Sequence, residues 1–171
     1  VYNVANTSVE EMLAGRVTFV EDDAAGCDAV MCAGLAHDRS APARLQIALR
    51  KLMAGAALVG LCADRAYPTP RGFEIGAGGV TAMLAYAAHV EPVYCGKPEA
   101  WFFLDLCRHL SVDPSRCVLI GDNLEADIAG ARRVGMKTIL TLTGLATRLT
   151  ADTSPADKRP DAIVADLSAL A

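Results

Sequence analysis

Two carboxylates and a lysine occupy positions at which a parallel α/β sheet places its ligand-binding loops. Asp122 follows the apolar stretch 117–120 across Gly121, and Asp127 comes in the first turn of the helix expected over residues 124–134. Gly121 permits a tight turn, and the positive end of the helix dipole favours carboxylates in its first turn. Two acids at one site suit Mg²⁺, which takes oxygen ligands and keeps waters that a substrate phosphate can replace.

The acidic residues also fit a structural role. Asp122 and Asn123 are suited to cap the helix, and Asp127 is suited to complement the helix dipole. Taken alone, the stretch supports both interpretations about equally.

Lys97 favours the metal site. It precedes Pro98, the first residue of the helix expected over 98–110, where a lysine opposes the helix dipole and therefore requires an anion. Together with Asp122 and Asp127 it predicts a mixed-charge pocket, in which the lysine neutralises phosphate oxygens and the acids hold the metal. A solvated lysine on a surface turn is the alternative.

The elements that must position these residues follow from hydrophobic periodicity, which predicts an α/β fold. The first half is expected to contain strands at 16–20, 29–32 and 57–62, helices at 42–53 and 80–89, and an irregular loop and domain joint over 63–79 that is rich in glycine and proline. The second half is expected to contain strands at 92–95, 117–120, 138–142 and 162–164, helices at 98–110 and 124–134, and a short helix at 166–170.

Alternating strands and helices imply right-handed crossovers and a parallel sheet. The four strands of the second half would make a thin sheet, so we expect it to be completed by residues that precede Val1. Ligands of such sheets bind beyond the carboxyl ends of the strands.

Composition excludes several classes of function. A formal charge of -4 and only 5% aromatic residues argue against a nucleic-acid partner. No apolar run reaches the roughly 18 residues that a membrane span needs. The six cysteines contain no C-x-x-C pair and the three histidines are isolated, which favours reduced thiols in a cytoplasmic protein over a zinc site.

The segments Gly96-Lys97-Pro98-Glu99 and Gly121-Asp122 through Asp127-Ile128 resemble the third and fourth motifs of the haloacid dehalogenase (HAD) superfamily. More narrowly, the chain resembles subfamily IIA, the nitrophenylphosphatase-like and phosphoglycolate-phosphatase-like enzymes, in which an α/β cap is inserted between the second and third motifs. The resemblance implies a cap over residues 1–86 and the C-terminal part of a Rossmann-like core over residues 87–171. The loop from Asp64 to Gly78 is similar to the passage from cap to core.

This resemblance implies a magnesium-dependent phosphatase that acts on small phosphorylated metabolites through an aspartyl-phosphate. By position, Lys97 would orient the nucleophile and the phosphate, Asp122 would be a metal ligand, and Asp127 would support the metal through water or hydrogen bonds. Asn123 and Asp64 are expected on the substrate side, although Asp64 also suits a turn-stabilising role. The subfamily further implies a homodimer formed through the cap.

The family's nucleophile, the first aspartate of an Asp-x-Asp pair, has no match here. The nearest candidate is Glu21 with Asp23 after the apolar residues 17–20, which we interpret as an acidic strand exit. We therefore expect the nucleophile to precede Val1 and the chain alone to be inactive. One alternative is a truncated, noncatalytic HAD-like binding or dimerisation module. Another is a receiver-like or mononucleotide-binding α/β domain, against which stand the lack of a glycine-rich phosphate loop that opens a helix and the lack of the first-strand acidic pocket of receivers. Departures from the family pattern at Cys62-Ala63, Asn123 and Ala126 leave the substrate open.

Overall fold

The computed structural model describes residues 1–4, 7–33 and 41–170 and divides the chain into two compact units. Unit 1 comprises residues 1–66 and 75–95, and unit 2 comprises residues 67–74 and 96–171. The predicted α/β class with parallel sheets is confirmed. The division of function between a cap over 1–86 and a core over 87–171 stays a prediction, and the compact units change over at residues 95 and 96.

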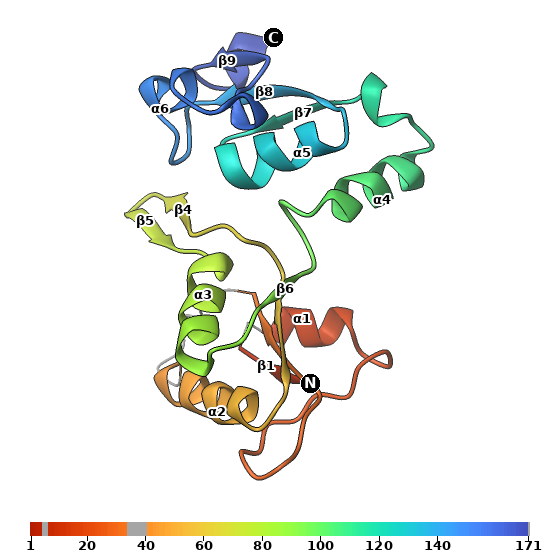
Figure 1. Ribbon diagram of the computed structural model, residues 1–171, viewed down its shortest axis with the longest axis vertical. Helices are drawn as coiled ribbons and strands as arrows, with labels where there is room; N and C mark the ends of the chain where they lie inside the picture. The colour runs from red at the N-terminus through yellow and green to blue at the C-terminus, as the bar shows by residue number, and fades with distance from the viewer. Residues whose placement is uncertain (5–6, 34–40, 171) are drawn as a thin grey trace. The chain divides into compact units, whose positions relative to one another are not determined.

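Unit 1 is built on a parallel sheet with the strand order β1-β2-β3-β6. Figure 1 shows α2 and α3 on one side of this sheet and α1 on the other. The strands are β1 (Tyr2–Asn3), β2 (Ala29–Cys32), β3 (Ala57–Gly60) and β6 (Val93–Tyr94), and the helices are α1 (Thr7–Met12), α2 (Ala41–Met53) and α3 (Ala77–Ala88).

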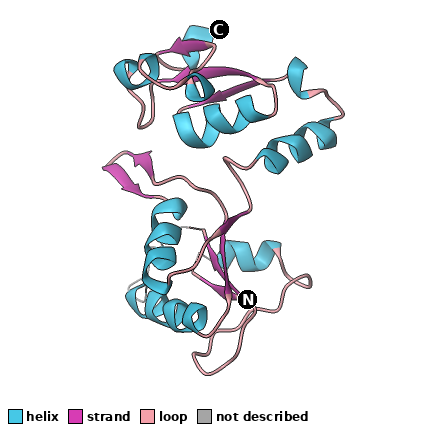
Figure 2. Ribbon diagram, in the orientation of Figure 1, coloured by secondary structure: helices cyan, strands magenta, loops and turns pink. Residues whose placement is uncertain are grey.

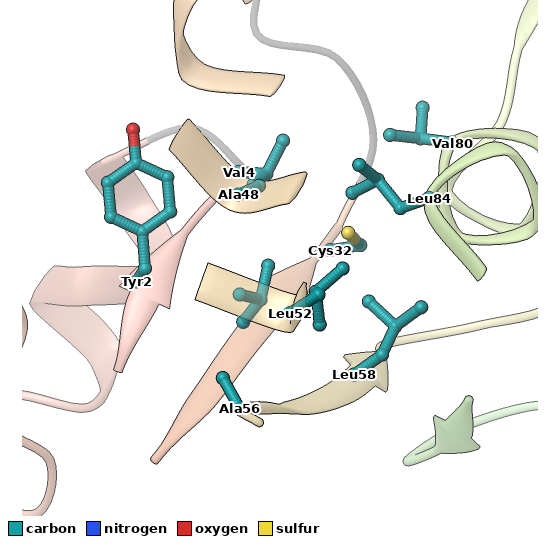
Figure 3. Close-up of a cluster of buried hydrophobic side chains, with 10 residues drawn as sticks. Tyr2, Val4, Cys32, Ala48, Leu52, Ala56, Leu58, Val80 and Leu84 are labelled. Atoms are coloured by element: carbon teal, nitrogen blue, oxygen red, sulfur yellow. The ribbon is translucent and has the colours of Figure 1, made fainter. Parts of the chain in front are cut away.

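The core of unit 1 lies between its sheet and the pair α2 and α3. Burial of apolar area at about 25 cal/mol per Å² drives this packing. The buried side chains shown in Figure 3 include Tyr2, Val4, Cys32, Ala48, Leu52, Ala56, Leu58, Val80 and Leu84. The 3.6-residue period of α2 places Ala48 and Leu52 on one inward face. Cys32 of β2 and Leu58 of β3 face the same core.

The passage over residues 63–79 is more regular than the sequence suggested. It contains the two-stranded sheet of β4 (Ala66–Thr69) and β5 (Gly72–Ile75), so the expectation of an irregular loop was wrong. Pro70 and Arg71 form the short connection, and Gly72 has a φ of 113°, which glycine adopts readily. The proline and glycine that suggested an irregular loop therefore form the turn of a hairpin.

Unit 2 carries a parallel sheet with the order β7-β8-β9 and several helices, which Figure 2 distinguishes by colour. The strands are β7 (Val118–Gly121), β8 (Lys137–Thr141) and β9 (Ala162–Val164). The helices are α4 (Ala100–Leu110), a π-helix (Leu124–Ala129), α5 (Gly130–Arg133), α6 (Arg148–Asp152) and 3-10 helices at Pro114–Arg116, Ala156–Lys158 and Leu167–Leu170.

Two buried clusters hold unit 2 together. One joins α4 to α5 and centres on Phe103, whose ring lies so close to Gly130 that a Cβ there would meet it at 2.4 Å. The other joins the π-helix, β8 and α6 through Ile128, Leu140 and Ala151.

Two expectations about strands were wrong, and one strand was missed. Residues 16–20 form no strand, and the two-residue β1 was not foreseen. The strand near 92–95 does not join β7: Val93 and Tyr94 pair with Val59 and Gly60 of β3. The bare backbone of Gly60 explains this pairing, because a Cβ there would lie 2.7 Å from the Tyr94 ring.

None of the helices in the described part of the chain is long and apolar enough to cross a membrane.

Candidate active site

The carboxyl ends of β7 and β8 open onto a cavity of about 620 Å³ in unit 2. Such strand ends are where open parallel sheets bind ligands. The lining residues are Lys97, Ile120, Gly121, Asp122, Asp127, Thr141, Thr143, Asp166, Leu167 and Ser168. The three residues that the sequence singled out for the metal and the phosphate are therefore in one place.

Asp127 organises the polar side of this cavity. Its Oδ1 accepts a hydrogen bond from Lys97 Nζ at 2.7 Å, and its Oδ2 accepts from the backbone N–H groups of Asp122 and Asn123, each at 3.2 Å. Only 7% of the Asp127 side chain is exposed, against 34% for Lys97. The helix expected from Pro98 begins only at Ala100, so Lys97 lies before the helix and not at its first turn. Its ammonium nevertheless pairs with an anion of the protein itself, and the same carboxylate fixes the backbone after β7.

The backbone after Asp122 forms a π-helix over Leu124–Ala129. Asn123 caps it, because its Oδ1 accepts from the N–H groups of Glu125 and Ala126 at 2.9 and 3.0 Å. The N–H groups of Asp127 and Ile128 both donate to the carbonyl of Asn123, which is the wide turn of a π-helix. Such turns are frequent at functional sites, and here the turn buries Asp127.

Two glycines make room for the carboxylates. A Cβ on Gly121 would lie 2.5 Å from the Asp127 side chain, and a Cβ on Gly144 would lie 2.5 Å from Asp122 Oδ2 and 2.8 Å from Asp122 Cβ. The loop after β8 therefore supports the side chain of Asp122 from one side. The sequence had suggested only the tight turn at Gly121.

The loops after β8 and β9 supply polar lining that sequence reasoning missed. Thr141 Oγ1 lies 2.9 Å from Thr143 Oγ1 and 3.5 Å from the carbonyl of Gly121, to which it donates. Asp166 accepts hydrogen bonds from the side chain and backbone of Ser168, and these hydrogen bonds hold the pKa of Asp166 below its usual value. Only their position at the ends of strands could have identified these residues from the sequence, because a search for charged motifs does not find hydroxyl groups.

Asp64 is not among the residues that line this cavity. It belongs to unit 1, where its backbone carbonyl accepts a hydrogen bond from Gly78 N–H at 2.9 Å. A Cβ on Gly76 would clash with the same carbonyl, so the close approach of these segments depends on glycine. The substrate-side role of Asp64 stays a prediction.

The acidic stretch before Ala24 takes a surface role. Asp23 forms a salt bridge with Arg50 at 2.6 Å, and the hydrogen bond from Arg50 lowers the pKa of Asp23. Glu21 lies 3.4 Å from Arg44. No strand precedes these residues, so the expectation of an acidic strand exit was wrong; Glu21 and Asp23 instead form ion pairs with Arg44 and Arg50.

The side chains that line the cavity offer oxygen donors: three carboxylates and three hydroxyls, beside one lysine. This hard-ligand set suits Mg²⁺, which commonly binds one or two protein carboxylates and completes its shell with water and phosphate. Among the described residues, no three His, Cys, Asp or Glu side chains are grouped closely enough to hold a metal ion by themselves. A magnesium ion here would therefore rest mainly on Asp122 and on oxygens of its ligand.

Residues 94–170 match the HAD-hydrolase-like family. A haloacid dehalogenase-like hydrolase domain-containing protein 2 from Homo sapiens is 37% identical over 111 residues, which cover 65% of this chain and 43% of that protein. The crystal structure of glycerol phosphate phosphatase Rv1692 from Mycobacterium tuberculosis in complex with magnesium superposes with a TM-score of 0.83 at 27% identity, over 99% of this chain and 50% of that one.

Residues 94–170 therefore belong to the haloacid dehalogenase superfamily. The resemblance to its nitrophenylphosphatase-like subfamily is confirmed as well. A further relative, the 5'-nucleotidase YutF of Bacillus subtilis (strain 168), is 37% identical over 94 residues, covering 55% of this chain and 37% of that protein. This HAD chain spans less than half the length of these curated relatives.

The residues that match the HAD family, 94–170, include Lys97, Asp122 and Asp127. The match therefore includes the whole cavity and every element of its lining. Unit 1 lies almost entirely outside that range, but the superposition with the magnesium-bound phosphatase covers 99% of this chain and so includes it.

Proposed function

We propose that the protein to which this chain belongs is a magnesium-dependent phosphatase of small phosphorylated metabolites. The observation that carries the proposal is the Lys97–Asp127 ion pair at 2.7 Å in the cavity that Asp122 also lines. The named relatives support the reaction class, since they include a glycerol phosphate phosphatase and a 5'-nucleotidase. These two act on different phosphate esters, so the proposal stops at the phosphoric monoester.

The charge of the cavity defines what can bind there. One lysine stands against three aspartates, Asp122, Asp127 and Asp166, so the formal charge is minus two. A phosphate dianion is repelled by such a site, whereas a divalent cation balances it. When bound, Mg²⁺ would supply electrostatic stabilisation of the phosphoryl oxygens.

The residues of this chain then have separate tasks. Asp122 would hold the cation, from a position set by the loop at Gly144. Asp127 would act through others, since both its oxygens accept hydrogen bonds from the protein: it orients the ammonium of Lys97 and fixes the backbone of Asp122. Lys97 would bind a phosphoryl oxygen and balance charge that develops on it.

Asn123 has a narrower role than the substrate contact predicted for it. Its Oδ1 is engaged in capping the π-helix, so we assign it to holding Asp122 in place. Three further points remain predictions: the substrate, the homodimer through the cap and a cytoplasmic location. Sedimentation of the purified protein tests whether it is a dimer.

The covalent step requires a nucleophile, and the 171 residues contain no Asp-x-Asp pair. We infer that this chain supplies the phosphate-orienting and metal-holding half of the site. Isothermal titration calorimetry of the chain with orthophosphate tests the inference: binding is expected with Mg²⁺ present and is expected to vanish with EDTA. Equal binding in both conditions would refute a metal-dependent site.

The activity itself is tested on the full-length protein. Hydrolysis of p-nitrophenyl phosphate is expected to require Mg²⁺ and to fall at least about a hundredfold in Lys97→Met, as when a transition-state electrostatic contact is removed. Metal and phosphate binding without turnover would instead identify a noncatalytic binding module.

A further inference from the structure

Two cysteines in unit 2 lie in contact. Cys107 and Cys117 have their sulfur atoms 3.8 Å apart. Cys107 faces inward from α4, where it is 2% exposed within the cluster around Phe103. Cys117 stands directly before β7 and is half-buried. The pair belongs to neither the cavity nor the proposed reaction.

The turn between the two cysteines is held by its own hydrogen bonds. Ser111 ends α4 in a left-handed conformation, and its N–H donates to the carbonyl of Arg108. Asp113 accepts from the backbone and the side chain of Ser115. The thiol of Cys117 donates to the carbonyl of Asp113 at 3.5 Å. These contacts keep the sulfurs adjacent without a covalent link.

We propose that Cys107 and Cys117 are a site of reversible oxidation, which forms an intrachain disulfide when the protein meets a peroxide. The sulfurs must approach from 3.8 Å to about 2.0 Å. A rotation of the half-buried Cys117 side chain is the simplest way to cover this distance, since Cys107 is packed. The proposal is independent of the phosphatase assignment.

The chemistry proceeds in two balanced steps. The thiolate of Cys117 attacks one oxygen of hydrogen peroxide, which breaks the O–O bond and gives a sulfenic acid and, after protonation, water. The sulfur of Cys107 then attacks the sulfur of Cys117, loses its proton and expels a second water. Two thiols are oxidised by two electrons and the peroxide is reduced.

Exposure assigns the order of these steps. Cys117 is the more accessible sulfur and meets the oxidant first, whereas burial raises the pKa of the Cys107 thiol and keeps it protonated until it attacks. Cys32 offers a contrast within the same chain. It is fully buried, and burial raises its pKa to about 11, so it is expected to resist the same treatment.

The bond would join the end of α4 to the start of β7. Lys97 precedes α4, and Asp122 follows β7, so the elements that carry two residues of the cavity become covalently tied. The short loop that the bond closes is expected to raise the thermal midpoint of unit 2 rather than lower it, because the cross-link restricts the unfolded chain.

The test begins with the whole chain treated with a small excess of hydrogen peroxide. Thiol titration under denaturing conditions is expected to fall from six thiols per chain to four, and dithiothreitol is expected to restore six. Non-reducing tryptic mapping is expected to yield residues 72–108 linked to residues 117–132. Trypsin leaves Lys97 uncut because Pro98 follows it.

Two variants make the result specific. Cys95 shares the peptide 72–108 with Cys107, so Cys95→Ser is expected to keep the cross-link, whereas Cys117→Ser is expected to abolish it while the fluorescence of Trp101 confirms folding. A cross-link lost in Cys95→Ser would overturn the proposal. So would oxidation of Cys117 to a sulfinic acid with no linked peptide.

Discussion

Removing the charge of Asp127 tests whether this residue organises the site. In Asp127→Asn the amide oxygen keeps either the two backbone N–H groups or Lys97, but not both, since its NH₂ group cannot accept from either. The contact that is lost is the 2.7 Å ion pair between Asp127, whose side chain is 7% exposed, and Lys97, whose side chain is 34% exposed. A hydrogen bond to a charged group contributes about 1.5–3 kcal/mol. Partial exposure of Lys97 places the expected loss near 2 kcal/mol.

The chain contains a matched control. Asp105 and Arg108 on α4 form an ion pair with the same 2.7 Å separation, but their side chains are 66% and 76% exposed. Exposed pairs on a helix contribute about 0.3–0.5 kcal/mol because water screens them. Asp105→Asn therefore removes the same kind of contact at the same distance, without the burial.

Urea unfolding followed by tryptophan fluorescence measures both variants. The only tryptophan, Trp101, lies on α4 in unit 2, so its signal reports the unit that carries both ion pairs. We expect the free energy of unfolding to fall by about 2 kcal/mol in Asp127→Asn and by less than about 0.5 kcal/mol in Asp105→Asn. Equal losses would show that Asp127 is an ordinary surface acid and would refute the argument from burial.

Two further changes probe the loops beyond β8. Gly144→Ala places a Cβ 2.5 Å from Asp122 Oδ2 and is expected to weaken Mg²⁺ binding by about 10- to 100-fold in calorimetry. The control Gly26→Ala, with no atom within 4 Å of the new Cβ, is expected to leave the affinity for Mg²⁺ unchanged. Equal affinities of the two variants would show that Gly144 does not support the site. The hydrogen bonds from Thr138 lower the pKa of Asp161, so the stability that its charge contributes is present above about pH 4 and is lost as the pH falls through the lowered pKa. Asp161→Asn is therefore expected to be less stable than the parent at neutral pH, with a difference that shrinks as the pH falls below about 4 in urea unfolding, and a constant difference would contradict this.

The part of the site that the sequence predicted is the part that is local in the chain. Asp122 and Asp127 are separated by one turn after a single strand, so the strand, the glycine and the helix start define their relation. Their union with Lys97 was inferred from charge, since a lysine at a helix N-terminus needs an anion. The 2.7 Å contact brings Lys97 and Asp127 together as expected, but α4 begins only at Ala100, so the argument from the helix dipole does not apply to Lys97.

The residues that were missed depend on contacts distant in sequence. Thr143 and Asp166 reach the cavity only because β8 and β9 end at the same edge of the sheet as β7. A hydroxyl has no charge pattern to reveal it, and Asp166 was expected only as the start of a short C-terminal helix over 166–170. The order in which the strands pair decides whether such residues meet, and the hydrophobic periodicity of the sequence does not encode that order.

The same limit explains the misplaced strand. Val93 and Tyr94 have the apolar character of a strand, and the pattern identified them as one. It did not identify the partner, because the choice between β3 and β7 depends on the fit of the Tyr94 ring over the bare backbone of Gly60. A glycine within a strand signals close approach by another group, but does not say which.

The position of Lys97 carries a consequence beyond its contact with Asp127. A lysine paired with a buried carboxylate cannot by itself make a cavity attractive to phosphate, because two further aspartates line the same space. Positive charge must come from a second source before a dianion can enter, and the oxygen donors around Asp122 suit a divalent cation. The arrangement therefore favours a fixed order in which the cation precedes the phosphate. The role of the ion pair is to hold the ammonium at one place, so that it meets the phosphate once the cation has neutralised the cavity.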